Sequence, residues 1–571
     1  MMRWLWLVLF SPFWLPRWAF GWARWKLRER TTLQVVLRGS LPDLSSSSGL
    51  LGLLRPPSGP DLLSLLEVLG AAARDEKLKT VLVRIEELHS GLGRAEELRA
   101  ALARLVSAGK QVIVFADELG LAGYWLALGA SSVRLSPTGS FNVSGVAMDF
   151  TLLEGLLRKA GVRAQLLARG KYKSAREMFT EQALSEPNRE MLTSLVEDLS
   201  GQLIALTSAA RGQSLESAAA HIHGGPFRAE EARERGLIDA TQYWDELWQE
   251  VGGESSQVQS LAVYRKALAR RRWPARKITQ VGLLRITGNL RHGHDRQGAT
   301  GPGATGHRSV ERALRRLVRS PSTRAIVVRV DSPGGSALAS DLMWRALTLA
   351  AEKKPVFVSM ANIAASGGYY ASGLKGVQVW ASPTTLTGSI GVVGGKFEGS
   401  ELLTKLGVQQ ASVTSGPHAN FYSPGRPWGA EELEKMERDL DALYRDFVSK
   451  MADARGLSYE ALHEVAQGRV WTGRQAQDKA LVDHLGGLYE VSVAVRERLG
   501  LDAAAPLGWS APSKPRGLFA ARREREADAL VRGVQAALSS LPELPEALAR
   551  ANDLRGERLF LLGSVELRIR S

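Results

Sequence analysis

The sequence contains no cysteine among its 571 residues. That absence excludes disulfide bonds, thiolate ligands for a metal ion and a cysteine nucleophile. Nucleic-acid recognition motifs are also missing, although the formal net charge is +15. The basic excess is mostly arginine scattered over helix-like segments, which is typical of solvated surface. We therefore predict no nucleic-acid partner.

A long, clean apolar run is absent as well. The most apolar stretch of the N-terminal segment 1–30 is Trp4–Pro16, shorter than the roughly 20 residues that a spanning helix needs. Six of the fifteen tryptophans nevertheless lie in this segment, and tryptophan favours the membrane–water boundary. It could be a marginal span, an interfacial helix or a signal segment; because no small-residue cleavage site stands out, we favour a retained membrane anchor. Most of its basic residues follow the apolar run, which on charge alone favours keeping the downstream side in the cytoplasm.

The chain contains two related halves. Matching segments recur in the same order, each 244 to 246 residues after its counterpart. The matched pairs are Val81–Ile85 with Ile326–Val330, Gly123–Trp125 with Gly368–Tyr370, Ser136–Thr138 with Ser382–Thr384, and Gly236–Asp239 with Ala480–Asp483. Ordered matches at nearly constant spacing indicate an internal repeat.

Each half alternates short β-type runs with helical patterns, which predicts a largely parallel α/β architecture in both. The predicted domains are a membrane-associated segment over 1–30, a first α/β domain over 31–260, a basic linker over 261–277, a second α/β domain over 278–505 and an extension over 506–571. The extension carries one apolar run, Leu559–Leu562, to which the sequence assigns no function. A glycine-rich loop over 298–306 resembles a phosphate loop only superficially, because His307 and Arg308 follow where Lys and Ser or Thr are required.

Two glycine-rich loops in the second half predict a nucleophilic site. Ser366 is flanked by alanine and glycine shortly after the strand-like run Val356–Met360, so its hydroxyl can be exposed and the Gly367 N–H can face a bound carbonyl. Gly334 and Gly335 follow another strand-like run and let the backbone approach a ligand closely. Such loops on neighbouring strands can form an oxyanion hole.

A serine hydroxyl needs a base, because it is a weak nucleophile at its own pKa. The nine histidines form no matching motif, and they offer no convincing metal site. The alternative base is a lysine kept neutral by desolvation, and the first half offers Lys171 and Lys173. The repeat strengthens this choice: Ser366 corresponds to Leu121 in the first half, and Lys173 corresponds to Ala419 in the second. One half holds the lysine and the other the serine, as expected of one composite site.

At these residues the chain resembles the long, two-domain form of bacterial signal peptide peptidase A, also called protease IV, over roughly residues 31–500. The segments that carry the resemblance are Tyr172–Ala175, Asp331–Ser336, Ala365–Tyr369, Leu386–Gly391, and Val470–Gly473 with Gly486. The resemblance implies that Ser366 is the nucleophile, that Lys173 is the general base and that Ser389 helps position the lysine amine. It also implies a fold related to Clp protease and crotonase. We predict no cofactor and no metal.

The same resemblance implies a bowl-shaped tetramer on the bacterial cytoplasmic membrane, with the catalytic domains on the periplasmic side and cleaved signal peptides or other apolar peptides as substrates. The N-terminal charge pattern disagrees with that orientation. The Trp-rich start, the segment Arg176–Phe179 and the extension beyond about residue 505 also depart from the family pattern.

Two other functions remain open at this stage. A crotonase-type enzyme uses a similar fold and similar glycine loops on acyl-CoA thioesters, without a serine–lysine pair. A non-catalytic membrane scaffold of the same fold would need none of these residues. Labelling by a serine-directed fluorophosphonate distinguishes the peptidase from the crotonase-type enzyme, and the intact Ser366, Lys173 and glycine loops argue against the scaffold.

Overall fold

The structure is a computed structural model that describes residues 30–44, 61–253, 257–271, 278–296, 303–511, 559–562 and 568–570. The chain forms two compact units. The first comprises residues up to 146 together with 200–277, and the second comprises 147–199 together with 278–569. Residues 147–199 belong to the first half of the sequence, yet they pack with the second half, and the helix α9 (Glu186–Arg211) runs from one unit into the other.

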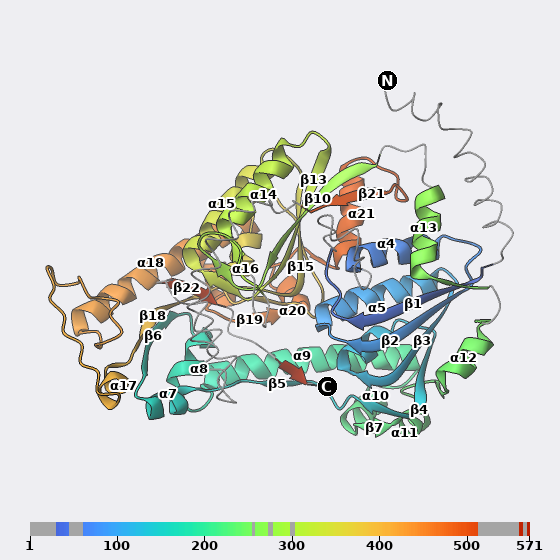
Figure 1. The fold of residues 1–571 in the computed structure, drawn as a ribbon, viewed down its shortest axis with the longest axis horizontal. Helices are drawn as coiled ribbons and strands as arrows, with labels where there is room; N and C mark the ends of the chain where they lie inside the picture. Colours follow the sequence, from blue (N-terminus) through green and yellow to red (C-terminus); the bar gives the residue numbers. More distant parts are fainter. Residues whose placement is uncertain are drawn as a thin grey trace. The chain divides into compact units, whose positions relative to one another are not determined.

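The first unit is built around a mostly parallel sheet in the order β7-β4-β3-β2-β1-β9, with β8 beside β4 (Figure 1). Its strands are β1 (Thr32–Gly39), β2 (Thr80–Leu88), β3 (Gln111–Gly120), β4 (Ser132–Asn142), β7 (Phe227–Arg228), β8 (Ala240–Thr241) and β9 (Val258–Ser260). Its helices are α4 (Leu62–Ala73), α5 (Leu92–Ser107), α6 (Leu121–Ala127), α10 (Leu215–His223), α11 (Ala229–Glu234), α12 (Trp244–Glu250) and α13 (Leu261–Arg271).

The second unit contains a sheet of the same design, in the order β19-β17-β15-β13-β10-β21, with β16 beside β15 and β20 beside β16. Its strands are β10 (Thr279–Thr287), β13 (Thr323–Ser332), β15 (Val356–Ala365), β16 (Val379–Ala381), β17 (Leu386–Gly388), β19 (Val470–Thr472), β20 (His484–Leu485) and β21 (Leu507–Ser510). The central strands read as near-continuous apolar runs and are buried, as expected of a parallel sheet covered on both faces.

The helices of this unit are α7 (Glu154–Ala160), α8 (Glu177–Thr180) after the short 3₁₀ turn η1 (Ser174–Arg176), α14 (His307–Arg319), α15 (Ala337–Ala351), α16 (Gly367–Ser372), α17 (Ser400–Lys405), α18 (Ala430–Arg455), α19 (Tyr459–Val465), α20 (Gly473–Asp478) and α21 (Leu488–Arg498). The long helix α18 buries Met436, Leu440, Phe447 and Met451 in the core of the unit. Its apolar side therefore packs within the protein.

A third sheet, also in the second unit, has the order β12-β11-β14-β22-β18-β6. Its strands are β6 (Arg163–Arg169), β11 (Leu290–Arg291), β12 (Thr305–Gly306), β14 (Gly334–Ser336), β18 (Val392–Glu398) and β22 (Leu559–Leu562); the chain also forms β5 (Ala147–Asp149) and β23 (Arg568–Arg570). The strand β6, from the first half of the sequence, pairs antiparallel with β18 along its whole length. This pairing explains why residues 147–199 join the second unit.

The repeat predicted from the sequence is confirmed by the matching strand orders of the two main sheets. The similarity between the two repeats also includes individual hydrogen bonds. Asp239 accepts the Val133 N–H at 2.6 Å, and its counterpart Asp483 accepts the Val379 N–H at 2.7 Å. Each of these carboxylates also binds an arginine at the end of the long helix, Arg211 in one repeat and Arg455 in the other. The two halves thus share their packing as well as their topology.

Several predicted segments lie wholly or partly outside the described residues. The Trp-rich segment does so up to residue 29, and within the ranges that the structure describes no helix is long and apolar enough to cross a membrane. The first part of the predicted linker forms helix α13. Its buried Tyr264 donates a hydrogen bond to Asp75 at 3.0 Å. The rest of the linker, residues 272–277, lies outside the described residues. The extension contributes β21, which pairs with β10, and β22.

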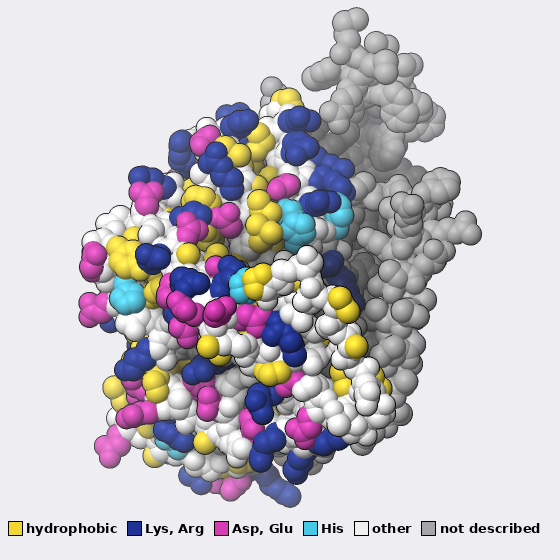
Figure 2. Space-filling view, turned by 90° about the vertical axis from the view of Figure 1, so that its left-hand side faces the viewer, with side chains coloured by type: hydrophobic (Ala, Val, Ile, Leu, Met, Phe, Trp, Pro, Cys, Tyr) yellow, Lys and Arg dark blue, Asp and Glu magenta, His cyan; other side chains and the backbone are white. Residues whose placement is uncertain are grey.

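On the face shown in Figure 2, lysine and arginine side chains are interspersed with aspartate and glutamate. Many carboxylates pair with neighbouring bases, as in the ion pairs Lys435–Asp439 and Lys405–Glu401 on two helices of the second unit. A mixture of signs fits a solvated surface better than a phosphate-binding track.

Candidate active site

Ser366 stands at the turn from β15 into α16, in the second unit. Its φ is +54°, a conformation that residues other than glycine seldom adopt, and its side chain is fully buried. Two backbone hydrogen bonds hold this turn: the Ser366 N–H donates to the Gly388 carbonyl at 2.8 Å, and the Tyr370 N–H donates to the Ser366 carbonyl at 2.8 Å. Strained backbone that is fixed on both sides is typical of functional sites.

The two glycines after Ser366 are required by close packing. A Cβ at Gly367 would lie 2.4 Å from the Ser340 hydroxyl oxygen and 3.2 Å from the Gly334 Cα. A Cβ at Gly368 would lie 2.7 Å from the Ser332 carbonyl oxygen. The start of α16 therefore sits directly against the glycine loop that follows β13.

That loop has its own internal bracing. Gly334 and Gly335 have φ values of +108° and +151°, and a Cβ on Gly335 would lie 2.2 Å from the Leu290 carbonyl oxygen. The Ser332 hydroxyl donates to the Gly288 carbonyl at 2.6 Å and accepts the Gly334 N–H at 3.1 Å. The Gly334 N–H is therefore already engaged, whereas the Gly335 nitrogen lies beside Gly367, 3.3 Å from where a Cβ there would be.

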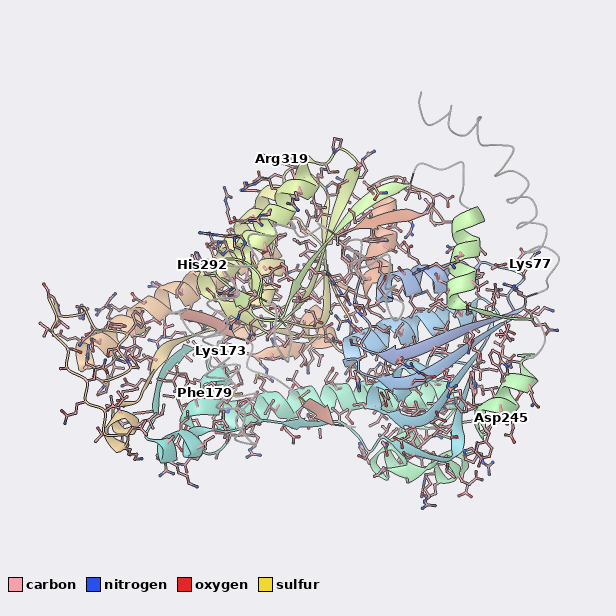
Figure 3. All side chains as sticks on the ribbon, in the orientation of Figure 1. Lys77, Lys173, Phe179, Asp245, His292 and Arg319 are labelled. Atoms are coloured by element: carbon pink, nitrogen blue, oxygen red, sulfur yellow. The ribbon has the colours of Figure 1, made fainter. Side chains whose placement is uncertain are left out.

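Lys173 reaches the serine within the same chain and the same unit. It lies where the chain leaves β6 and enters the η1 turn, as labelled in Figure 3. Its Nζ lies 2.8 Å from Ser366 Oγ, 3.0 Å from Ser389 Oγ and 2.9 Å from the Ser389 carbonyl oxygen. The predicted pair therefore comes together, and the alternative in which two subunits share the site is not needed to bring the side chains into contact.

Burial lowers the pKa of Lys173 well below the ordinary lysine value. The cause is desolvation, which penalises the charged ammonium form. The contacts also suit a neutral amine with two N–H groups and one lone pair. One N–H goes to the Ser389 carbonyl, which can only accept, the second can go to Ser389 Oγ, and the lone pair then faces the Ser366 hydroxyl. A neutral amine in this position can accept the serine proton.

Ser389 follows β17 in a second strained turn. Its φ is +53°, and its N–H donates to the Arg469 carbonyl at 2.7 Å. This geometry turns both the Ser389 hydroxyl and its carbonyl toward the lysine amine. The backbone carbonyl is a partner that motif matching did not identify.

The sequence also did not reveal how the lysine segment is seated. A Cβ on Gly468, whose φ is +79°, would lie 2.6 Å from the Lys173 backbone nitrogen and Cβ. A Cβ on Gly170 would lie 2.4 Å from the Gln467 carbonyl carbon, and the Tyr172 N–H donates to the Gln467 carbonyl at 2.8 Å. One sequence feature could have pointed to this contact. Both halves have a glycine shortly before a short strand: Gly224 before β7 and Gly468 before β19.

Ion pairs fasten the first part of α9 to the segment around β19. Asp198 accepts the Thr472 hydroxyl at 2.8 Å and pairs with Arg474 at 2.5 Å. Glu190 pairs with Arg469 at 2.5 Å, next to the carbonyl that binds Ser389. These contacts hold the lysine-bearing segment against the strand that helps place Ser389.

The positions that align with Ser366 and Lys173 in the opposite repeat do not have the backbone geometry or the burial of the dyad. Leu121 begins α6 after an N-cap glycine with a φ of −91°, and Ala419 lies exposed in a loop. His221 contacts Gln213, and among the described residues no group of three His, Asp or Glu side chains is placed to hold a metal ion.

The sequence is similar to those of known peptidases. The model of peptidase family S49 matches residues 104–257 and 348–502. The chain is 31% identical over 491 residues to "Serine protease SPPA, chloroplastic" of Arabidopsis thaliana, covering 85% of this chain and 71% of that protein. It is 31% identical over 401 residues to "Protease 4" of Salmonella typhi, covering 68% of this chain and 63% of that one.

Among solved structures, "ClpP1 from Listeria monocytogenes" matches 36% of this chain and 89% of its own, with 16% identity and a TM-score of 0.22. The assignment rests on the sequence comparisons. The chain therefore belongs to peptidase family S49, as a serine peptidase that carries the family's domain twice.

Proposed function

We propose that this chain is a membrane-associated endopeptidase that uses a Ser366–Lys173 dyad to degrade cleaved signal peptides and other apolar peptides through an acyl-enzyme. The observation that carries the proposal is the 2.8 Å contact between Lys173 Nζ and Ser366 Oγ in a buried site. A buried lysine with a lowered pKa is suited to act as the base.

In the proposed reaction, neutral Lys173 takes the Ser366 proton while the oxygen attacks the carbonyl carbon of a peptide bond. The lysine then gives that proton to the leaving amine as the tetrahedral intermediate collapses to an ester. A water molecule, deprotonated by the same amine, hydrolyses the ester and restores Ser366. Ser389 positions the amine through its hydroxyl and carbonyl oxygens during both halves.

The negative oxygen of the intermediate needs two preorganised donors. We assign the N–H groups of Gly367 and Gly335, because these two glycines touch and because the Gly334 N–H is already donated to Ser332. The sequence left open whether Gly334 or Gly335 supplies the second N–H, and these contacts favour Gly335.

The third sheet offers a place for an extended peptide. The strands β14 and β18 are separated there by one strand, so the space between them spans about 9.6 Å, twice the usual strand spacing. We call this space, bounded by β14 and β18, the peptide slot. A substrate strand inserted there would pair on both sides and would pass Gly335, whose loop packs against Gly367 at the start of α16.

Membrane association, a periplasmic location on the bacterial cytoplasmic membrane and a tetrameric state are parts of the same proposal. They are supported by the Trp-rich segment 1–30 and by the resemblance at the site residues. Sedimentation of the native protein with anionic vesicles tests membrane association, its mass in detergent tests the tetramer, and protease accessibility in intact cells tests the periplasmic location. Protein that stays in the supernatant would contradict membrane association, and a mass equal to that of one chain would contradict the tetramer.

The central test is hydrolysis of a fluorogenic apolar peptide by detergent-purified full-length protein. Ser366→Ala and Lys173→Ala should each reduce turnover to background, a loss of about four orders of magnitude or more. Lys171→Ala is the matched control, because Lys171 is exposed two residues away. Equal turnover by all four proteins would refute the assignment of the dyad.

A further inference from the structure

One helix of the second unit departs from the mixture of charges found elsewhere on the surface. Helix α14 carries five arginines and a single acidic residue, Glu311, in 13 residues. On other helices of the unit, basic side chains pair with carboxylates, as Lys450 does with Asp446 and Lys375 with Asp453. Lysine and arginine side chains gather in the upper part of Figure 2, at the level where Figure 1 shows α14. The excess of positive charge is therefore local.

Four of these arginines form a row on the solvent side of α14. The opposite side of the helix is buried through Val310, Leu314 and Leu317. The row has the spacing i, i+4, i+7 and i+11 of one helix face, and its four side chains are exposed: Arg308, Arg312, Arg315 and Arg319. None of these side chains forms an ion pair or a hydrogen bond with any residue that the structure describes. Their charges are therefore open to a partner.

Helix α15 presents a second row at the same spacing. It packs beside α14, and both helices connect neighbouring strands of the sheet in the order β10, β13 and β15, which places them on the same face. The row consists of Leu338, Leu342, Arg345 and Leu349, in which Leu338 and Leu349 are 55% and 40% exposed. We call the two rows together the basic face.

We propose that the basic face binds an anionic lipid bilayer. A cluster of roughly four to eight basic residues on a helix is typical of contact with anionic lipid headgroups, because the guanidinium groups pair with lipid phosphates. The exposed leucines beside the arginines favour a bilayer over a nucleic acid, since apolar side chains can enter the headgroup layer. This inference rests on the membrane association in the proposed function for its purpose, but it needs neither the Trp-rich segment 1–30 nor catalysis.

The test compares two kinds of vesicle, because the Trp-rich segment could bind both. Full-length protein is sedimented with vesicles of phosphatidylcholine alone and with vesicles that also contain phosphatidylglycerol. We expect wild type to prefer the anionic vesicles by about tenfold or more. A triple variant that combines Arg312→Gln, Arg315→Gln and Arg319→Gln should lose this preference. The preference of wild type should also disappear near 1 M salt, where charges are screened within about 3 Å.

The matched control removes the same number of positive charges from another part of the second unit. It combines Lys375→Gln, Lys405→Gln and Arg438→Gln, three bases that each pair with a carboxylate. This variant should keep the wild-type preference for anionic vesicles, and circular dichroism should verify that both triple variants are folded. An equal loss in both triple variants would overturn the proposal, because net charge alone would then explain the binding.

Two further results would also overturn it. Wild-type binding that is independent of lipid charge would leave membrane association to other segments. Weaker binding of the Arg312, Arg315 and Arg319 variant to duplex DNA, with vesicle binding unchanged, would assign the basic face to nucleic acid. By contrast, a charge-dependent preference in a protein without peptidase activity would support the basic face and refute the proposed reaction.

Discussion

The same strand-to-helix turn occurs in both repeats, but only one of the two carries a nucleophile. In the first repeat β3 enters α6 at Leu121, after a glycine in ordinary extended conformation. In the second repeat β15 enters α16 at Ser366, with a φ of +54° and with glycines at the next two positions. The fold supplies the turn in both places, and the chemistry depends on local strain and close packing that one copy alone possesses.

The other partner shows the reverse pattern. The region around Ala419 is exposed, whereas the corresponding Lys173 is buried against Gly468 and Ser389. The lysine segment of the first half has joined the third sheet through β6, where it pairs with β18. One repeat therefore donates a segment to the other, and the two copies have divided the dyad between them.

Among the variants that test the difference between the two repeats, Gly367→Ala should have the largest effect on activity. The Cβ would meet Ser340 Oγ at 2.4 Å and crowd Gly334, so the oxyanion donors would separate. We expect kcat to fall by about 10²–10³-fold with little change in KM. The matched control is Ala122→Gly, the aligned position in the first repeat, which should leave kcat unchanged. A Gly367→Ala enzyme with wild-type kcat would contradict the donor assignment.

Ser389→Ala should have a smaller effect. The variant loses the hydroxyl contact at 3.0 Å, but it retains the carbonyl contact at 2.9 Å that also holds Lys173. We expect kcat to fall by roughly tenfold, equivalent to about 1.4 kcal/mol, with the melting temperature nearly unchanged. If the alanine variant were fully active, the positioning role would be wrong.

A stability measurement probes the buried lysine directly. The pKa of Lys173 is lowered in the folded chain, so above that pKa and below the ordinary value of 10.5 the unfolded chain holds a proton that the folded chain lacks. Wild-type stability should therefore gain with rising pH in this window, relative to a variant without the amine. The difference in urea midpoint, Lys173→Met minus wild type, should therefore be smaller at pH 10 than at pH 7. A difference independent of pH would contradict a neutral lysine.

The smallest expected effect is that of placing a serine in the first repeat. Leu121→Ser in a Ser366→Ala background should show no fluorophosphonate labelling, because that turn lacks the positive φ and the buried amine. Circular dichroism should verify folding, since removing a buried leucine costs about 2–5 kcal/mol. Labelling of this double variant at the substituted position would show that the turn alone is sufficient and would break the comparison.

Much of the fold was predictable from the sequence, because the repeat and the apolar runs identify the central strands of both sheets. The pairing of Ser366 with Lys173 was also predictable, from the complementary losses at Leu121 and Ala419. Both inferences use patterns longer than a few residues or compare two copies of one pattern.

The rest depends on partners far apart in the chain. Strands of two to four residues, such as β11, β14 and β22, carry too little periodicity to be recognised. The transfer of β6 to the second unit and the seating of Lys173 on Gly468 are set by tertiary packing, which local patterns do not encode. The backbone carbonyl of Ser389 has no sequence signature at all.

The most direct test of the central claim is the rate of fluorophosphonate labelling at Ser366 as a function of pH, in wild type and in Lys173→Met. We predict that the wild-type rate rises with pH along a limb centred well below the ordinary lysine pKa, and that the methionine variant is labelled at background rate throughout. Labelling of Lys173→Met at the wild-type rate would show that Ser366 does not depend on this lysine.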